Sequence, residues 1–356
     1  IISTNTGSKN TAFGYYAGRL ITSGYQNVYL GYEAGQNNSL GYKNIAIGPR
    51  AGQNSNTYNS IFIGSSQTDT EGIGIGSQTI GNFDIFIGVD VGTNNTIGEK
   101  NIGIGYEAAK NNTTGNTNIF MGQYAGRNNT QGSENINIGK QAGATVTTGN
   151  RNIYIGTNSG SSSGINATDV IAIGYYAGQH NAADASIFIG KNAGKMNTNG
   201  IGNILIGPDA GLSTQESAYS IMIGRNAGKS HNSTSGTGQN IYIGDNVAEQ
   251  STSGIRNIAI GANAICVGEF INSTIAIGYN AGKNIGTRET GNTSNNIIIG
   301  YEAAADGNIN QRNIITGTQA GQYIDNPITF TGNLLMGTEA GKYANSAVNS
   351  IAIGNA

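Results

Sequence analysis

The chain has 356 residues, a net charge of −2 and only 11% charged residues. Nucleic-acid binding and attachment to anionic membranes both depend on clustered Lys and Arg, so this composition argues against both. No apolar run approaches the ~20 residues of a bilayer-spanning helix, and we expect no membrane insertion in this segment.

A five-residue motif recurs along the whole chain. It reads Asn-Ile-Ala-Ile-Gly at 44–48 and Asn-Ile-Tyr-Ile-Gly at 152–156. We count 21 glycines that close such a motif, mostly 17 residues apart with gaps of 12 to 22. A regular period of this length indicates stacked structural repeats. We therefore expect residues 1–356 to form one all-β repeat array, a parallel β-solenoid of about 21 short coils.

The spacing of the closing glycines varies in chain order. The first coils end at Gly14, Gly31, Gly48 and Gly64, and two short coils of twelve residues are predicted to follow, closing at Gly76 and Gly88. Regular coils continue from there. The longest loops fall before three later closing glycines, Gly244, Gly300 and Gly337. Variable length between the motifs is typical of loops inserted on one outer edge of a solenoid.

Each motif predicts a short strand and two turns. In an Ile-x-Ile triplet the two Ile side chains share one face, and we expect this face to point into the coil. An Ala-Gly pair such as Ala125-Gly126 follows most of the closing glycines and fits a tight corner. The Asn before the strand, for example Asn118, is expected to tolerate left-handed backbone angles and to hydrogen-bond along the stack.

The middle residue of the triplet would then face outward. At 12 positions it is aromatic or long and apolar, which predicts a hydrophobic stripe and an interface with other chains. The alternative is that these residues fill the core. The predicted interface residues are Tyr29, Phe62, Phe86, Phe120, Tyr154, Phe188, Leu205, Met222, Tyr242, Ile298, Ile315 and Leu335.

The repeat is similar to that of a known family. The string Asn-Ile-Ala-Ile-Gly-x-x-Ala at 44–51 resembles the head repeat of YadA-like trimeric autotransporter adhesins. The segment 10–17 is similar to repeats of phage-type tail-fibre proteins. The resemblance implies a left-handed β-roll, a homotrimer and an extracellular position on a cell-surface appendage or a virion fibre. The period, typically 17 here, is longer than in the adhesin heads.

The sequence offers little for catalysis or cofactor binding. We predict no catalytic residue, no cofactor and no metal site, because the two histidines, His180 and His231, lie far from Cys or acidic pairs. Carboxylates are scattered over positions expected to be outer corners, for example Asp84, Asp90, Glu107 and Asp245. Paired carboxylates between coils or chains could support glycoside cleavage, but nothing in the sequence selects a pair.

The sequence therefore predicts a non-enzymatic fibre shaft. It would be a rigid spacer within a longer fibre protein that associates with itself, as a trimer on the resemblance, and presents polar loops. An alternative is a receptor- or glycan-binding module, in which Tyr279 and Tyr301 are candidate contacts for a surface glycan or host receptor. A polysaccharide depolymerase is the less favoured alternative.

Overall fold

The computed structural model describes residues 7–66, 75–76, 79–161, 166–232, 238–269, 271–286, 293–306, 309–324, 330–344 and 346–355. These residues form short strands and turns, and no helix occurs among them. The chain divides into two compact units, Ile1–Tyr176 and Ala177–Ala356. The two units are built in the same way.

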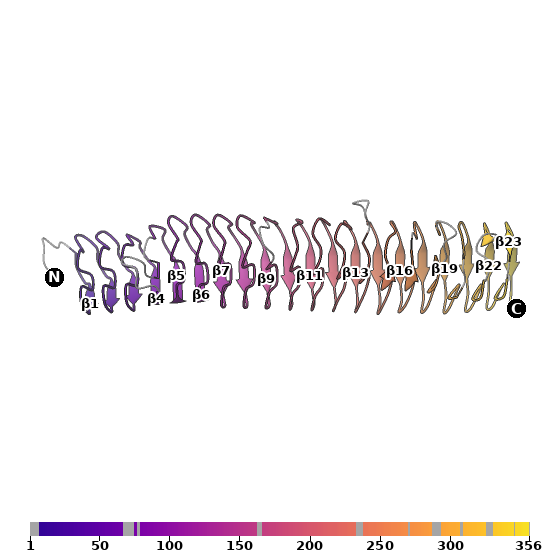
Figure 1. Cartoon of the computed structure of the whole chain (residues 1–356), viewed down its shortest axis with the longest axis horizontal. Helices are drawn as coiled ribbons and strands as arrows, with labels where there is room; N and C mark the ends of the chain where they lie inside the picture. Colours follow the sequence, from indigo (N-terminus) through magenta and orange to yellow (C-terminus); the bar gives the residue numbers. More distant parts are fainter. Residues whose placement is uncertain are drawn as a thin grey trace. The chain divides into compact units, whose positions relative to one another are not determined.

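In the first unit, each strand pairs in parallel with the next strand along the chain, and the strands stand side by side in Figure 1. Their register places residues of equivalent motif position opposite each other. The strands are β1 (Thr11–Phe13), β2 (Val28–Leu30), β3 (Ile45–Ile47), β4 (Ile61–Ser65), β5 (Ile85–Val89), β6 (Ile102–Tyr106), β7 (Ile119–Met121), β8 (Ile136–Ile138), β9 (Ile153–Ile155) and β10 (Ile171–Ile173).

The second unit has the same parallel ladder. Its strands are β11 (Ile187–Ile189), β12 (Ile204–Ile206), β13 (Ile221–Ile223), β14 (Ile241–Ile243), β16 (Ile258–Ile260), β18 (Ile275–Ile277), β19 (Ile297–Ile299), β20 (Ile314–Thr316), β22 (Leu334–Met336) and β24 (Ile351–Ile353). Two small parallel pairs lie in its loops, β15 (Gln250–Ser251) with β17 (Val267–Gly268) and β21 (Phe330–Thr331) with β23 (Ala347–Val348). Each ladder has ten strands among the described residues, and the predicted all-β parallel solenoid is confirmed.

The two twelve-residue coils predicted to close at Gly76 and Gly88 form a single turn in the structure. Strand β4 pairs directly with β5, with Ile61 opposite Ile85. Gly76 was predicted to close a strand, but its φ of 59° matches the corner glycine Gly52 at 57° and differs from the closing glycine Gly64 at 143°. The segment 67–74, which contains most of the supposed extra triplet, lies outside the described residues. The prediction of a separate coil ending at Gly76 is therefore wrong.

The side-chain direction predicted for the strands is also wrong. The middle residue of the triplet points into the coil, whereas the two flanking residues point outward and are about one-third exposed or more in examples such as Ile138 and Ile260, both 36%. A one-residue shift in a strand exchanges its two faces, so every position reverses together. The predicted interface residues lie instead in the core, at most 3% exposed: Tyr29, Phe62, Phe86, Phe120, Tyr154, Phe188, Leu205, Met222, Tyr242, Ile298, Ile315 and Leu335.

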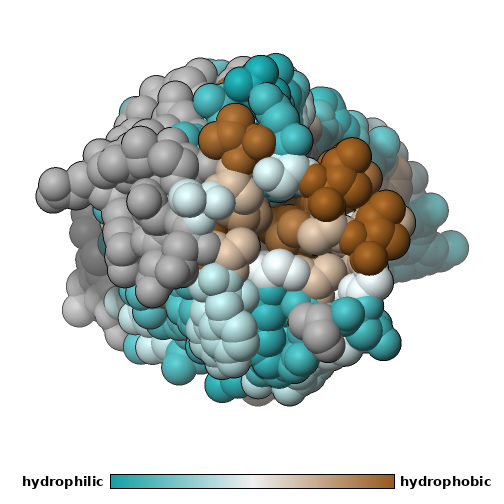
Figure 2. Space-filling view, turned by 90° about the vertical axis from the view of Figure 1, so that its right-hand side faces the viewer, coloured by the Kyte–Doolittle hydropathy of each residue, from teal (hydrophilic) through white to brown (hydrophobic). Residues whose placement is uncertain are grey.

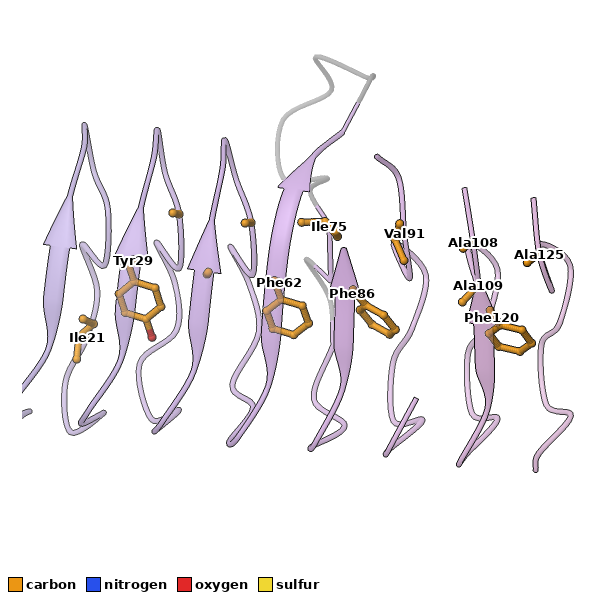
Figure 3. Packing of buried hydrophobic residues seen from close by; sticks show 13 residues of the cluster. Ile21, Tyr29, Phe62, Ile75, Phe86, Val91, Ala108, Ala109, Phe120 and Ala125 are labelled. Atoms are coloured by element: carbon orange, nitrogen blue, oxygen red, sulfur yellow. The ribbon is translucent and has the colours of Figure 1, made fainter. Parts of the chain in front are cut away.

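The corner glycine explains how a large side chain fits inside so narrow a coil. Figure 3 shows the Phe62, Phe86 and Phe120 rings extending from their strands across the interior. A Cβ atom added at Gly126 would overlap the Phe120 ring, and the φ of Gly126 is 55°. Glycine adopts this left-handed angle without strain and leaves the ring the room it needs, although alanine takes the same corner in other turns, such as Ala248 (φ 49°) in the turn of Tyr242. The Ala-Gly corner and the buried middle residue are therefore one packing unit.

A second inward position adjusts the core to the size of the middle residue. This position lies three residues after the corner glycine. It is Asn129 in the turn of Phe120, but it is Val146 in the turn of the polar Asn137 and Ile285 in the turn of the small Ala276. All three are fully or nearly fully buried. Close packing requires this exchange of volume, because an unfilled cavity or an overfilled core destabilises the fold.

The asparagine ladder forms as predicted, with one difference. Asn118 Oδ1 accepts a hydrogen bond from the Asn135 backbone N–H (2.9 Å) on the next turn, and Asn118 Nδ2 donates to the Gly132 carbonyl (2.8 Å). The left-handed angle belongs to the preceding residue, Thr117, at φ 58°, and not to the asparagine. The buried amide thus satisfies backbone groups that a tight turn would leave without partners.

The orientation can be tested with a pair of charged substitutions in neighbouring strands. We expect Phe120→Asp to lower the urea unfolding midpoint strongly, by the equivalent of about 4 kcal/mol or more, because it removes a core ring and buries a charge. Ile138→Asp, on the outward face, is expected to cost less than about 1 kcal/mol in the isolated chain. Equal effects of the two substitutions on circular-dichroism melts would contradict this orientation.

Candidate functional site on the outward surface

Each unit carries an apolar outward face. We call it the flank face, and it consists of the first and third residues of each ladder strand. In the second unit its third-position residues include Ile243, Ile260 and Ile277, which lie opposite one another on successive strands and are each 36% exposed. Further members are similarly exposed, such as Ile299 at 41% and Ile314 at 42%. Figure 2 looks onto the end that lies on the right in Figure 1 and shows hydrophobic residues at the centre and right of that end, with hydrophilic residues above and below them.

The flank face is large for a surface exposed to water. The partly exposed apolar residues at the two flanks of nearly every one of the ten strands leave on the order of 1,000 Å² of apolar surface per unit, whereas the largest patch on a typical monomer is about 300–600 Å². Sequence reasoning found the two apolar faces of the triplet but exchanged them. The near-constant Ile at both flanks was an available signal, because an interface built from repeats requires uniformity whereas a core tolerates compensating changes of size.

The two predicted receptor-contact residues lie on the outer surface. Tyr279 and Tyr301 each follow a closing glycine directly and are 45% and 50% exposed. Their rings stack with centroids 5.4 Å apart and planes inclined by 17°. The structure therefore places these residues together and accessible. That a receptor or glycan contacts them stays a prediction.

Other residues at the same motif position, immediately after the closing glycine, form a column beside the flank face. In the turns before Tyr279 this column contains Arg225, Asp245 and Ala262. Arg225 Nε donates to Asp245 Oδ1 (2.8 Å) and Arg225 Nη2 to Asp245 Oδ2 (2.6 Å). The bidentate contact with the guanidinium lowers the pKa of the Asp245 carboxyl, so the pair is ionised and half-exposed.

Three of the four carboxylates predicted at outer corners are buried. Asp90 and Glu107 are 3% and 6% exposed, and both lie near Lys110, whose Nζ is 2.8 Å from Glu107 Oε1 and 3.9 Å from Asp90 Oδ2. Arg127 also contacts Glu107, at 2.6 Å. Asp84 is fully buried, and only Asp245 is outward. Buried, cation-paired carboxylates are poorly placed to reach a polysaccharide, which disfavours these residues as a depolymerase pair.

Asp84 replaces the asparagine of the ladder in its turn. Asp84 Oδ1 accepts from the Asn101 backbone N–H (2.8 Å), and Oδ2 accepts from Asn95 Nδ2 (3.0 Å), which also donates to the Gly98 carbonyl (3.0 Å). Burial is the largest cause that raises the pKa of this carboxyl from 3.8 to about 7; the nearby Glu99 also raises it, and the Asn101 and Asn95 hydrogen bonds oppose the shift. Asp84 therefore titrates in the physiological range.

His231 is a neutral core residue. It is fully buried, its Nε2 lies 3.0 Å from Asn240 Nδ2, and its ring packs edge-on against Tyr242. Burial lowers its pKa from 6.5 to about 4. Across the described residues, no group of three or more His, Cys, Asp and Glu side chains could hold a metal ion. In the same residues, no helix is long and apolar enough to cross a membrane.

No known protein-family model matches the chain, and a comparison with curated proteins gives no significant match.

The pH dependence of stability can be tested at Asp84. The folded chain binds the Asp84 proton more tightly than the unfolded chain, so the stabilisation is complete below about pH 4 and is lost as pH rises to about 7. A shift of this size corresponds to at most about 4 kcal/mol. Asp84→Asn restores the ladder amide. The variant is expected to lose the part of the pH dependence that Asp84 causes, measured as urea unfolding midpoints between pH 4 and 8. An unchanged pH profile in the variant would contradict this account.

Proposed function

We propose that the chain is a non-enzymatic segment of an extracellular fibre, a rigid shaft that associates with copies of itself and presents polar loops. The observation that carries the proposal is the flank face. An apolar face of this size, repeated turn after turn, requires a partner with the same periodicity. Another copy of the same chain is the simplest molecule with matching residues at every turn.

Three chains around one axis are the arrangement that we propose. The resemblance of the Asn-Ile-Ala-Ile-Gly repeat to the heads of trimeric adhesins supports the number three and a left-handed coil. Closed cyclic symmetry also lets each identical face be covered without leaving an end that would continue to aggregate. The interface would consist of the flanking residues and not of the middle residues that the sequence had suggested.

A solenoid is suited to a shaft because its stability comes from contacts between neighbouring turns. The parallel ladders and buried amides provide these contacts along each unit. We place such a shaft on a cell-surface appendage or a virion fibre, as the family resemblance implies. Adhesion by such a fibre would add many weak contacts, because linked copies of a site bind more tightly than one.

A second function, recognition of a surface glycan or host receptor, is favoured by the exposed Tyr279–Tyr301 pair. Stacked aromatic rings offer a rigid apolar surface with a polar hydroxyl edge. This function is compatible with the shaft, since the pair lies in the column beside the flank face and not within it.

Native mass spectrometry tests the self-association. We expect the wild-type chain to have the mass of three chains, and the triple variant Ile243→Glu, Ile260→Glu, Ile277→Glu to have the mass of one, because three carboxylates would be buried in each copy of the interface. The control Asn199→Glu, at an exposed loop position, should remain a trimer. A wild-type chain that is monomeric at micromolar concentration would contradict the proposal.

A further inference from the structure

In the column beside the flank face, the small side chain of Ala262 stands between the larger side chains of Asp245 and Tyr279. We call this position the Ala262 step. Backbone hydrogen bonds fix the order of its members: the Asn263 N–H donates to the Asp245 carbonyl (3.0 Å), the Asn280 N–H to the Ala262 carbonyl (3.0 Å) and the Glu302 N–H to the Tyr279 carbonyl (2.8 Å). Ala262 therefore lies between Asp245 and Tyr279 on successive turns. With a strand spacing of about 4.8 Å, the backbones at Asp245 and Tyr279 are roughly 10 Å apart.

One face of the Tyr279 ring is turned toward this step. The opposite face stacks on Tyr301, so the remaining face points along the column toward Ala262. A methyl group cannot cover a phenol ring, and Tyr279 is 45% exposed. At another exposed tyrosine stack of this motif position, Tyr15–Tyr32, the next residue is the larger Pro49, and the Arg50 guanidinium lies 5.6 Å from the Tyr32 ring centroid.

The far side of the step is polar and charged. Asp245 and Arg225 form the bidentate ion pair described above, with side chains 45% and 61% exposed. Such a pair still has acceptor sites on the carboxylate and donor N–H groups on the guanidinium. The step is therefore bounded by the Tyr279 ring on one side and by the charged Arg225–Asp245 pair on the other, with Ala262 between them. The charged pair provides both hydrogen-bond donors and acceptors.

We propose that the Ala262 step, bounded by Tyr279 and the Arg225–Asp245 pair, binds one pyranose unit of a glycan. A pyranose ring has an apolar C–H face that packs on an aromatic ring, and hydroxyl groups at its edge that hydrogen-bond to carboxylate and guanidinium groups. A ring packed about 4 Å from Tyr279 would leave roughly 6 Å toward the Asp245 turn, enough for a hydroxyl group and its hydrogen bond.

This site deepens the adhesive part of the proposed function, because it names the ligand class and the contact residues. It does not depend on how many chains form the fibre. A single pyranose contact is weak, and repetition of the site on each chain of an assembly would increase the apparent affinity.

The test uses the whole chain on an array of defined oligosaccharides, followed by calorimetric titration of any bound glycan. We expect at least one glycan to bind and Ala262→Tyr, which fills the step, to weaken binding by at least tenfold. Tyr279→Ala should have a similar effect. Tyr occupies the equivalent position at Tyr279 and Tyr301, so Ala262→Tyr is expected to fold normally by circular dichroism.

The matched control is Tyr343→Ala, which removes an exposed ring from another stack, with Tyr323 at 5.4 Å between centroids, and should change affinity by less than twofold. Absence of any glycan binding, or full binding by Ala262→Tyr, would overturn the site. Native mass spectrometry of the same samples separates this outcome from failure of the fibre proposal, since the trimer mass does not require the glycan site.

Discussion

The structure depends on the contact between the middle side chain of a strand and the corner residue of the same turn, which is glycine in most turns and alanine or isoleucine in the others. At Phe120 and Gly126 the ring occupies the space where a Cβ atom would lie. A coil this narrow accepts about one large side chain from each strand, so the two flanking residues of the triplet have to point outward. The apolar outer face is thus a consequence of how the inside is filled.

The sequence predicted the solenoid because its determinants are local and repeated. The closing glycines, the Ala-Gly corners and the asparagine ladder each have a distinct backbone role, and their spacing reports them directly. The inward or outward orientation of the strand side chains could not be predicted from the two-residue alternation alone. Alternation indicates which residues share a face but not which of the two faces points into the coil. The exchange of volume between Ala276 and Ile285 was a usable signal, because compensation between distant positions occurs in a core.

Two other errors have equally specific causes. Ile75-Gly76 resembles the end of a triplet by composition, yet Gly76 has the φ of a corner and the Ile75 carbonyl accepts from the Gly52 N–H as an alanine would at that place. Asp84, Asp90 and Glu107 were expected at outer corners. Asp84 instead replaces a buried asparagine of the ladder, where the Asn95 amide contacts it, and its place in the repeat was the better guide. Asp90 and Glu107 lie at a position that is often charged, and Lys110 contacts both.

The same geometry divides the surface into regions with different chemistry. Flanking Ile residues form a uniform apolar face suited to self-association, and the neighbouring column after the closing glycine varies between Tyr, Ala, Asp and Arg. Uniformity is suited to a repeated interface and variation to local recognition. One turn of backbone can thus supply a shaft and a binding surface without conflict, because the two functions use different motif positions.

The inward direction of the middle residue is the central claim, and thiol accessibility measures it most directly. In a background in which the buried Cys266 is replaced by alanine, single cysteines would be placed at Tyr154 and at its outward neighbour Ile155. Labelling by a small maleimide at low chain concentration should be rapid at position 155 and should require unfolding at position 154. Rapid labelling at 154 with protection at 155 would contradict the account.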